Sequence, residues 1–88
     1  MPFRRSDEPE LDALTRELAV QVAAERTRRG LTQVELATLC GTTQSAVARL
    51  EKGTRPPRLD TLLRIANALD CELDVRLRPR TSLDEREP

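Results

Sequence analysis

The sequence of 88 residues predicts an all-α fold of four helices, followed by one C-terminal β-strand. Three observations lead to this fold class. Apolar residues recur every three or four positions in four successive segments, and glycine or proline separates these segments. After Asp70 the apolar spacing changes to every second position, which is typical of a strand. Phe3 is the only aromatic residue, so we expect a core of aliphatic side chains.

The first helix is predicted to begin at Pro9, because proline is favoured in a first helical turn. It should end near Arg29, where Gly30 provides a left-handed stop. Residues 1–8 precede it as a flexible arm. Its expected buried stripe consists of Leu11, Leu14, Leu18 and Val22.

The second helix has an unusually clear start. Thr32 and Glu35 have the spacing of a capping box, in which each side chain accepts a hydrogen bond from a backbone N–H at the helix start. Leu31 and Leu36 occupy the two positions of a hydrophobic staple. The helix is therefore expected from about residue 33 to residue 39, with Gly41 as its stop.

A third helix should follow from residue 44 to residue 52, with Thr43 as its N-cap and Gly53 as its stop. Two helices joined by a short turn with glycine form a helix-turn-helix unit. A fourth helix is expected after the stiff Pro56–Pro57 loop, although no side-chain cap opens it. Its buried stripe should comprise Leu62, Ile65, Ala66 and Leu69.

The third helix has one polar face. Five of its residues fall within an arc of about 140° on a helix with 3.6 residues per turn, and Val47 and Leu50 lie opposite them. Glutamine can pair with adenine, arginine with guanine, and a small apolar side chain can contact a thymine methyl group. An ordinary solvated face is the alternative interpretation, but the helix-turn-helix signals before this helix favour a face that contacts DNA bases. The five residues are Gln44, Ser45, Ala48, Arg49 and Lys52.

The net charge is zero, but the charges are unevenly distributed. Residues 26–64 contain eight basic and three acidic residues, a net charge of +5, whereas the N-terminal part is acidic. The basic middle is the part expected to face phosphate. Arg55 and Arg58 flank the proline loop beside the third helix, and Lys52 ends that helix. We expect phosphate contacts from all three.

Several other classes of protein are disfavoured. The chain has no histidine, and Cys40 and Cys71 are far apart in sequence, so we expect no metal site, no cofactor and no enzyme. No apolar stretch has the length of a membrane span. The N-terminus has no secretory h-region, which predicts a cytoplasmic protein. Single-stranded RNA binding is disfavoured because the chain has no aromatic platform on which bases could stack.

The motifs of residues 31–69 together resemble one known family. The patterns G-L-T-Q-x-E-L-A, G-T-T-Q, L-E-x-G and L-L-x-I-A-x-A-L are similar to those of the xenobiotic-response-element family, which includes the lambdoid phage repressors and Cro. The resemblance covers about residues 18–70. It implies a repressor-like helix-turn-helix domain, residues 9–70, that reads duplex DNA and regulates transcription.

The resemblance also implies roles for individual residues. Gln33 would contact a phosphate and help to position the third helix, and Thr43 would cap that helix and bind phosphate. Base edges would be read by Gln44, Ser45 and Arg49. In several members of the family an arginine of the first helix pairs with the glutamate of L-E-x-G, which here implies a structural ion pair between Arg26 and Glu51.

The predicted strand, residues 71–79, has no partner within its own chain. A single strand needs one for its backbone groups, so we expect the same strand of a second copy, antiparallel across a two-fold axis. A register centred on Val75 places Leu73 opposite Leu77. It also brings together two pairs of opposite charge, Glu72 with Arg78 and Asp74 with Arg76. A short helix is the alternative for this segment, and residues 80–88 are expected to be a disordered tail.

This ending resembles antitoxins of the HipB and HigA kind, whose helix-turn-helix domains can dimerise through a terminal strand. The resemblance implies an alternative function, in which the chain binds a toxin protein and represses its own operon. A protein-interaction module that does not read DNA is a further alternative. The favoured function is that of a homodimeric repressor that reads a palindromic operator through the helix at residues 44–52.

Overall fold

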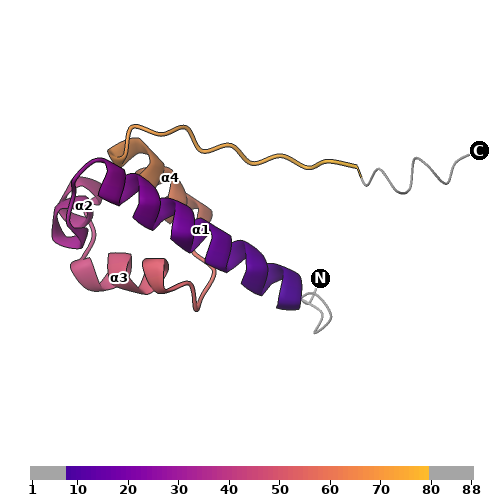
Figure 1. The fold of residues 1–88 in the computed structure, drawn as a ribbon. Coiled ribbons are helices and arrows are strands. Elements are labelled where there is room, and N and C mark those ends of the chain that lie inside the picture. Colours follow the sequence, from indigo (N-terminus) through magenta and orange to yellow (C-terminus); the bar gives the residue numbers. More distant parts are fainter. Residues whose placement is uncertain (1–7, 80–88) are drawn as a thin grey trace, which may run out of the picture.

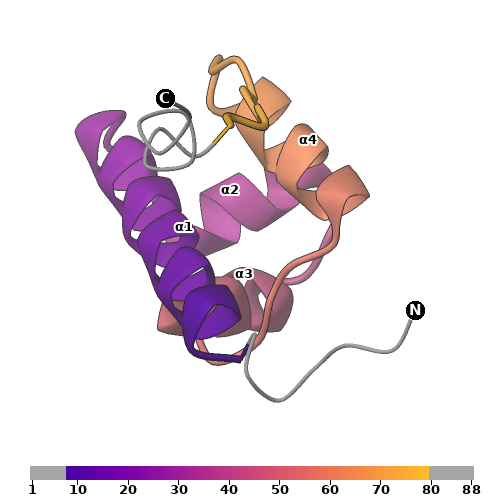
Figure 2. The ribbon, with the colours of Figure 1, turned by 90° about the vertical axis from the view of Figure 1, so that its right-hand side faces the viewer.

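The structure is a computed structural model that describes residues 8–79. Four helices follow one another: α1 (Glu8–Arg28), α2 (Gln33–Cys40), α3 (Gln44–Lys52) and α4 (Leu59–Ala68). The long α1 crosses the molecule diagonally in Figure 1, with α4 above it and α3 below it. Figure 2 shows α1 and α4 on opposite sides, with α2 between them and α3 beneath. The predicted four-helix fold is therefore confirmed.

Local hydrogen bonds set the start of α2 and α3. The Thr32 side chain accepts from the Glu35 N–H at 3.0 Å, and the Glu35 carboxylate accepts from the Thr32 N–H at 2.8 Å. This is the predicted capping box. The Thr43 side chain caps α3 by accepting from the Ala46 N–H at 3.1 Å. The N-cap of α4, Arg58, makes no such bond.

The core lies where the four helices meet and is entirely aliphatic among the described residues. Leu36 of α2 and Val47 of α3 are the most deeply buried large side chains. Leu31, at the predicted staple position, is half-buried and packs against this cluster. The buried residues of the cluster are Val22, Leu36, Ala37, Val47, Leu50, Ile65 and Leu69.

The predicted buried stripe of α1 is wrong in part. Leu14 is 58% exposed, and the buried positions of the helix are Thr15, Ala19 and Val22. The reason is the close approach of the end of α3. A Cβ atom at Gly53 would lie 3.2 Å from the Ala19 Cβ, so only a face of small side chains leaves room there. The Thr15 hydroxyl is satisfied because it donates to the Leu11 carbonyl at 2.8 Å.

The predicted strand is not formed in the single chain. Residues 71–79 contain neither helix nor strand and run away from the helices as an extended segment (Figure 1). A strand is defined by hydrogen bonds to a neighbour, and none of the described residues provides one. Cys71 and Leu73 are half-buried, whereas Val75 is 69% exposed and Leu77 is 99% exposed, so the apolar face of this segment is uncovered at its end.

The two predicted terminal segments are largely outside the described residues. The arm was predicted over residues 1–8, of which only Glu8 is described, as the first residue of α1. The predicted tail, residues 80–88, lies wholly outside them.

Candidate nucleic-acid interface

The turn between α2 and α3 sets the angle between the two helices. Gly41 has a left-handed backbone with φ 70°, which a residue with a Cβ atom rarely adopts. The Thr42 N–H donates to the Ala37 carbonyl at 2.9 Å and ends α2. Because Val47 and Leu50 of α3 are buried, the opposite face of that helix is turned to solvent.

The predicted base-reading face of α3 is accessible. Gln44, Ser45 and Arg49 are exposed, and Ala48 between them is half-buried. Amide, hydroxyl and guanidinium groups therefore stand on one side of the helix. This combination can donate and accept hydrogen bonds at the edges of bases.

A hydrogen-bonded chain of side chains links this face to α1. Arg26 donates to Glu51 through Nε at 2.7 Å and Nη2 at 3.0 Å, which is the predicted ion pair. Glu51 also accepts from Gln33 Nε2 at 3.0 Å. Gln33 Oε1 in turn accepts from Gln44 Nε2 at 2.8 Å. The residue predicted to contact phosphate thus touches the residue predicted to read a base.

The Glu51 carboxylate is ionised in this setting. Burial by itself would raise the pKa of the carboxyl group. The hydrogen bonds from Arg26 and Gln33 and the charge of Arg26 outweigh burial, so the pKa lies below its ordinary value of 4.5. The same contact raises the pKa of Arg26. Both partners are therefore charged at neutral pH.

Sequence reasoning missed the two bonds of Gln33. They join residues 18 and 11 positions apart, and no spacing rule relates side chains on separate helices. One signal was present: Gln33 and Gln44 each directly follow a threonine N-cap. Two polar side chains at the first turns of adjoining helices are placed to meet.

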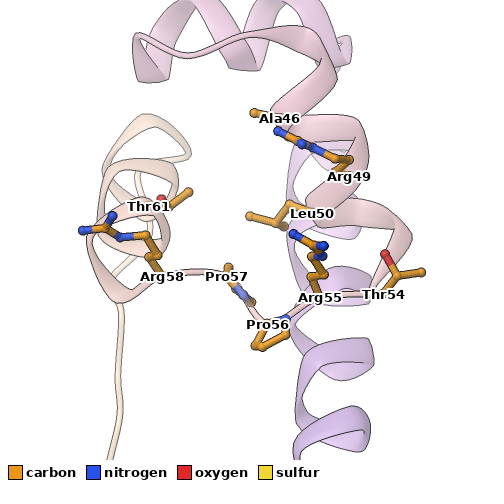
Figure 3. Close-up of a pocket in the computed structure, with 9 residues that line it drawn as sticks. All are labelled: Ala46, Arg49, Leu50, Thr54, Arg55, Pro56, Pro57, Arg58 and Thr61. Atoms are coloured by element: carbon orange, nitrogen blue, oxygen red, sulfur yellow. The ribbon is translucent and has the colours of Figure 1, made fainter.

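A hollow of about 600 Å³ lies between α3 and the start of α4. Figure 3 shows Arg49 and Arg55 on one side of it and Arg58 and Thr61 on the other, with the two prolines of the connecting loop below. The Arg58 guanidinium points away from the other two arginines (Figure 3). Three of the predicted DNA contacts therefore surround one hollow beside the recognition face.

The cations around the hollow are not equally free. Arg58 Nε lies 3.2 Å from an oxygen of Asp60, in an exposed ion pair of low strength. Lys52 is exposed at the end of α3. Thr43 is exposed too, and its hydroxyl oxygen is already engaged as the cap of α3.

The residues predicted for dimerisation lie away from this face, on the extended segment after α4. Leu73 is half-buried and lines a small hollow of about 100 Å³ between α1 and α4, together with Leu18 and Leu62. Glu72 and Arg78 are exposed. Arg76 bonds Asp74 of its own chain at 2.9 Å.

Among residues 8–79, no helix combines the length and the apolar character that crossing a bilayer requires.

The comparisons with known proteins agree on one family. The family model described as helix-turn-helix matches residues 22–75. An HTH-type transcriptional regulator from Sinorhizobium fredii is 37% identical over 59 residues, which are 67% of this chain and 30% of the relative. Another from Haemophilus influenzae is 36% identical over 58 residues, which are 66% of this chain and 59% of the relative. The chain thus spans about a third of the length of the first relative and less than two thirds of the second.

Solved structures have the same arrangement of helices. The restriction-modification controller protein C.AhdI from Aeromonas hydrophila superimposes with a TM-score of 0.66 at 36% identity, over 69% of this chain and 88% of that protein. A transcriptional regulator from Vibrio cholerae superimposes with a TM-score of 0.65 at 29% identity, over 69% of this chain and 35% of that protein.

Proposed function

The chain belongs to the helix-turn-helix family of DNA-binding transcriptional regulators, and on this premise we propose that it represses transcription by reading a palindromic operator in duplex DNA. The observation that carries the proposal is the outer face of α3. It presents Gln44, Ser45 and Arg49 to solvent next to a hollow flanked by three arginines. This is a class of regulators and not of enzymes.

Four side chains of α3 read bases in this proposal. The Gln44 amide faces an adenine and the Arg49 guanidinium faces a guanine, each through two hydrogen bonds. Ser45 bonds a base edge, and Ala48 contacts a thymine methyl group. Their support is the exposure of the polar groups and the small size of Ala48, which allows the helix to approach the groove closely.

Five side chains around them contact the phosphates. Such contacts hold the protein in register on the duplex without reading sequence. The support is position: each residue lies at the start or end of α3, at the start of α2 or α4, or on the loop before α4. The five are Gln33, Thr43, Lys52, Arg55 and Arg58.

Residues 71–79 act as a dimerisation strand in this proposal, beside the DNA-binding domain of residues 9–70. Two copies pair antiparallel about Val75, which covers the exposed Val75 and Leu77 side chains. Leu73 then meets Leu77, Glu72 meets Arg78, and Asp74 exchanges the Arg76 of its own chain for that of the second copy. Each pair of opposite charges contributes about 0.2–1 kcal/mol.

A toxin as a second partner has no support from the contacts described or from the relatives named, which are transcriptional regulators and a controller protein. The antitoxin function is therefore not proposed.

The test is selection from random duplex DNA by the full chain, followed by titration of the enriched duplex over a series of salt concentrations. We expect an inverted repeat whose half-sites lie about one helical turn apart. Its affinity should fall steeply with salt because bound phosphates release counterions. The control is the double variant Gln44→Ala, Arg49→Ala, whose substituted side chains are exposed and leave the core intact.

This variant should fold and bind weakly, but should enrich no sequence. Enrichment of the same repeat by the variant would overturn the assignment of α3 as the reading helix. Absence of any enriched sequence with the natural chain would overturn DNA reading itself.

A further inference from the structure

A continuous chain of hydrogen bonds runs from the edge of the core to the DNA-facing side of α3. It joins Arg26, Glu51, Gln33 and Gln44 in that order, with donor–acceptor distances between 2.7 and 3.0 Å. The direction of these bonds decides which atoms of Gln44 remain free for another molecule. That direction is set at one residue, Glu51.

An ionised carboxylate has acceptor atoms only. The Gln33 amide must therefore turn its NH2 group towards Glu51, and its oxygen is left facing Gln44. Gln44 must then turn its own NH2 group towards Gln33. What remains free on Gln44 is the oxygen and one N–H, an acceptor and a donor side by side.

We propose that Glu51 is a positioning residue that holds the Gln44 amide in the orientation that selects adenine over guanine. This inference rests on the proposed function, because it requires Gln44 to read a base. Adenine presents one acceptor, N7, and one donor, the N6 amino group, which match the free N–H and oxygen of Gln44. Guanine presents two acceptors, N7 and O6. A flipped Gln44, with both N–H groups outward, would match guanine instead.

The burial of Glu51 makes this control effective. Its side chain is 7% exposed, and two hydrogen bonds from Arg26 fix the carboxylate in place. Gln33 is less suited to a test because it has two roles. One of its two N–H groups bonds Glu51, and the other remains available for a phosphate, so replacing Gln33 changes affinity as well as discrimination.

The decisive variant is Glu51→Gln. The new amide both donates and accepts, so the Gln33 amide can adopt either orientation and the Gln44 amide can follow it. Arg26→Lys is the matched control, because it weakens the same ion pair but leaves the carboxylate at position 51. Circular dichroism at the assay temperature establishes that both variants are folded.

Binding is measured on the duplex that the natural chain enriches from random DNA, and on the same duplex with one A·T pair changed to G·C. The pair to change is the one whose preference disappears in Gln44→Ala. We expect the natural chain and Arg26→Lys to favour adenine by about tenfold or more, and Glu51→Gln to favour it by less than about threefold. The base pair read by Arg49 should keep its preference in both variants.

Three results would overturn the role of Glu51. The first is an adenine preference that is retained in Glu51→Gln, and the second is an equal loss of the adenine preference in Arg26→Lys. The third is a simultaneous loss of preference at the base pair read by Arg49, which would indicate a general loosening of α3. If Glu51→Gln does not fold, Gln33→Met breaks the same chain one residue further out. This variant should weaken binding to both duplexes and abolish the adenine preference. A retained adenine preference would overturn the inference.

The failure of the proposed function is distinguishable from the failure of this inference. If the natural chain enriches no sequence, DNA reading fails, and the role of Glu51 fails with it. If a sequence is enriched but the pair that depends on Gln44 is not A·T, the role of Glu51 fails while DNA reading stands.

Discussion

Arg26 and Glu51, 25 positions apart in sequence, form a two-bond ion pair that ties α1 to α3. The same guanidinium donates through Nη1 to the Leu31 carbonyl at 2.7 Å, in the connection between α1 and α2. One side chain therefore joins three segments. Because the Glu51 side chain is nearly buried, removing Arg26 leaves a carboxylate without its counter-charge.

Replacement of Arg26 by alanine should lower the free energy of unfolding by about 2–3 kcal/mol, because the arginine is itself 18% exposed and a fully buried pair would lose more. The double variant Arg26→Met, Glu51→Leu should recover part of this loss, since it leaves no unpaired charge. Urea unfolding of the three proteins measures both effects. A double variant less stable than Arg26→Ala would contradict the account.

The contribution of Glu51 to stability should depend on pH. Its pKa is lowered on folding, so the carboxylate stabilises the folded state fully above its unfolded pKa, and this contribution is lost as the pH falls through the lower folded value. The difference in unfolding free energy between the natural chain and Glu51→Gln should therefore shrink on acidification below about pH 4.5. Urea unfolding from pH 7 to pH 3 tests this, and a constant difference would refute it.

The capping box of α2 should contribute measurably to stability. Thr32→Ala removes the acceptor for the Glu35 N–H and should cost about 1 kcal/mol. Thr38→Ala is the matched control in the same helix. Its hydroxyl only donates to the Val34 carbonyl within the helix, so its loss should be close to neutral. Equal losses of unfolding free energy in the two variants, measured by urea unfolding, would argue against a specific role of the cap.

Base and phosphate contacts should be separable by one substitution in α3 and one in the loop that follows it. Arg49→Ala should weaken binding to the enriched duplex by about 1–3 kcal/mol and relax the preference at one base pair. Arg55→Ala should weaken binding to all duplexes alike. It should also reduce the magnitude of the slope of log affinity against log salt concentration by about one. Titration of sequence variants over a salt series distinguishes them. A relaxed sequence preference in Arg55→Ala would contradict its assignment to phosphate.

The dimer proposal predicts the effect of a charge at its axis. Val75→Asp places two carboxylates opposite each other and should give monomers in sedimentation equilibrium. Val20→Asp on α1 is the control, because Val20 is exposed to a similar degree, 67% against 69%, and lies outside the segment. A monomeric natural chain, or a dimeric Val75→Asp, would exclude pairing about Val75.

Elements set by local interactions were predictable. The capping box of Thr32 and Glu35 depends on residues three apart, and Gly41 and Gly53 both adopt the left-handed backbone that ends a helix. These features follow from spacing within a single turn of chain. The outer face of α3 was predictable for the same reason, because the position of Val47 and Leu50 determines which residues lie opposite.

The buried face of α1 was not predictable from periodicity alone. A stripe through Leu14 and one through Thr15 and Ala19 both have helical spacing, and the first is the more apolar. The structure selects the second because the end of α3 approaches at Gly53 and leaves no room for leucine. The predicted strand after α4 is different in kind, because no second strand is present among residues 8–79 and the segment forms none in the single chain.

The sequence by itself determined the four helices, their caps and the residues displayed on α3, because these depend on hydrogen bonds and packing between near neighbours. Only the tertiary structure decided that Gln33 bonds both Glu51 and Gln44. The physical reason is that these contacts exist only once α2 has packed against α3, and the chain of bonds reaches α1 only once α3 has packed against α1.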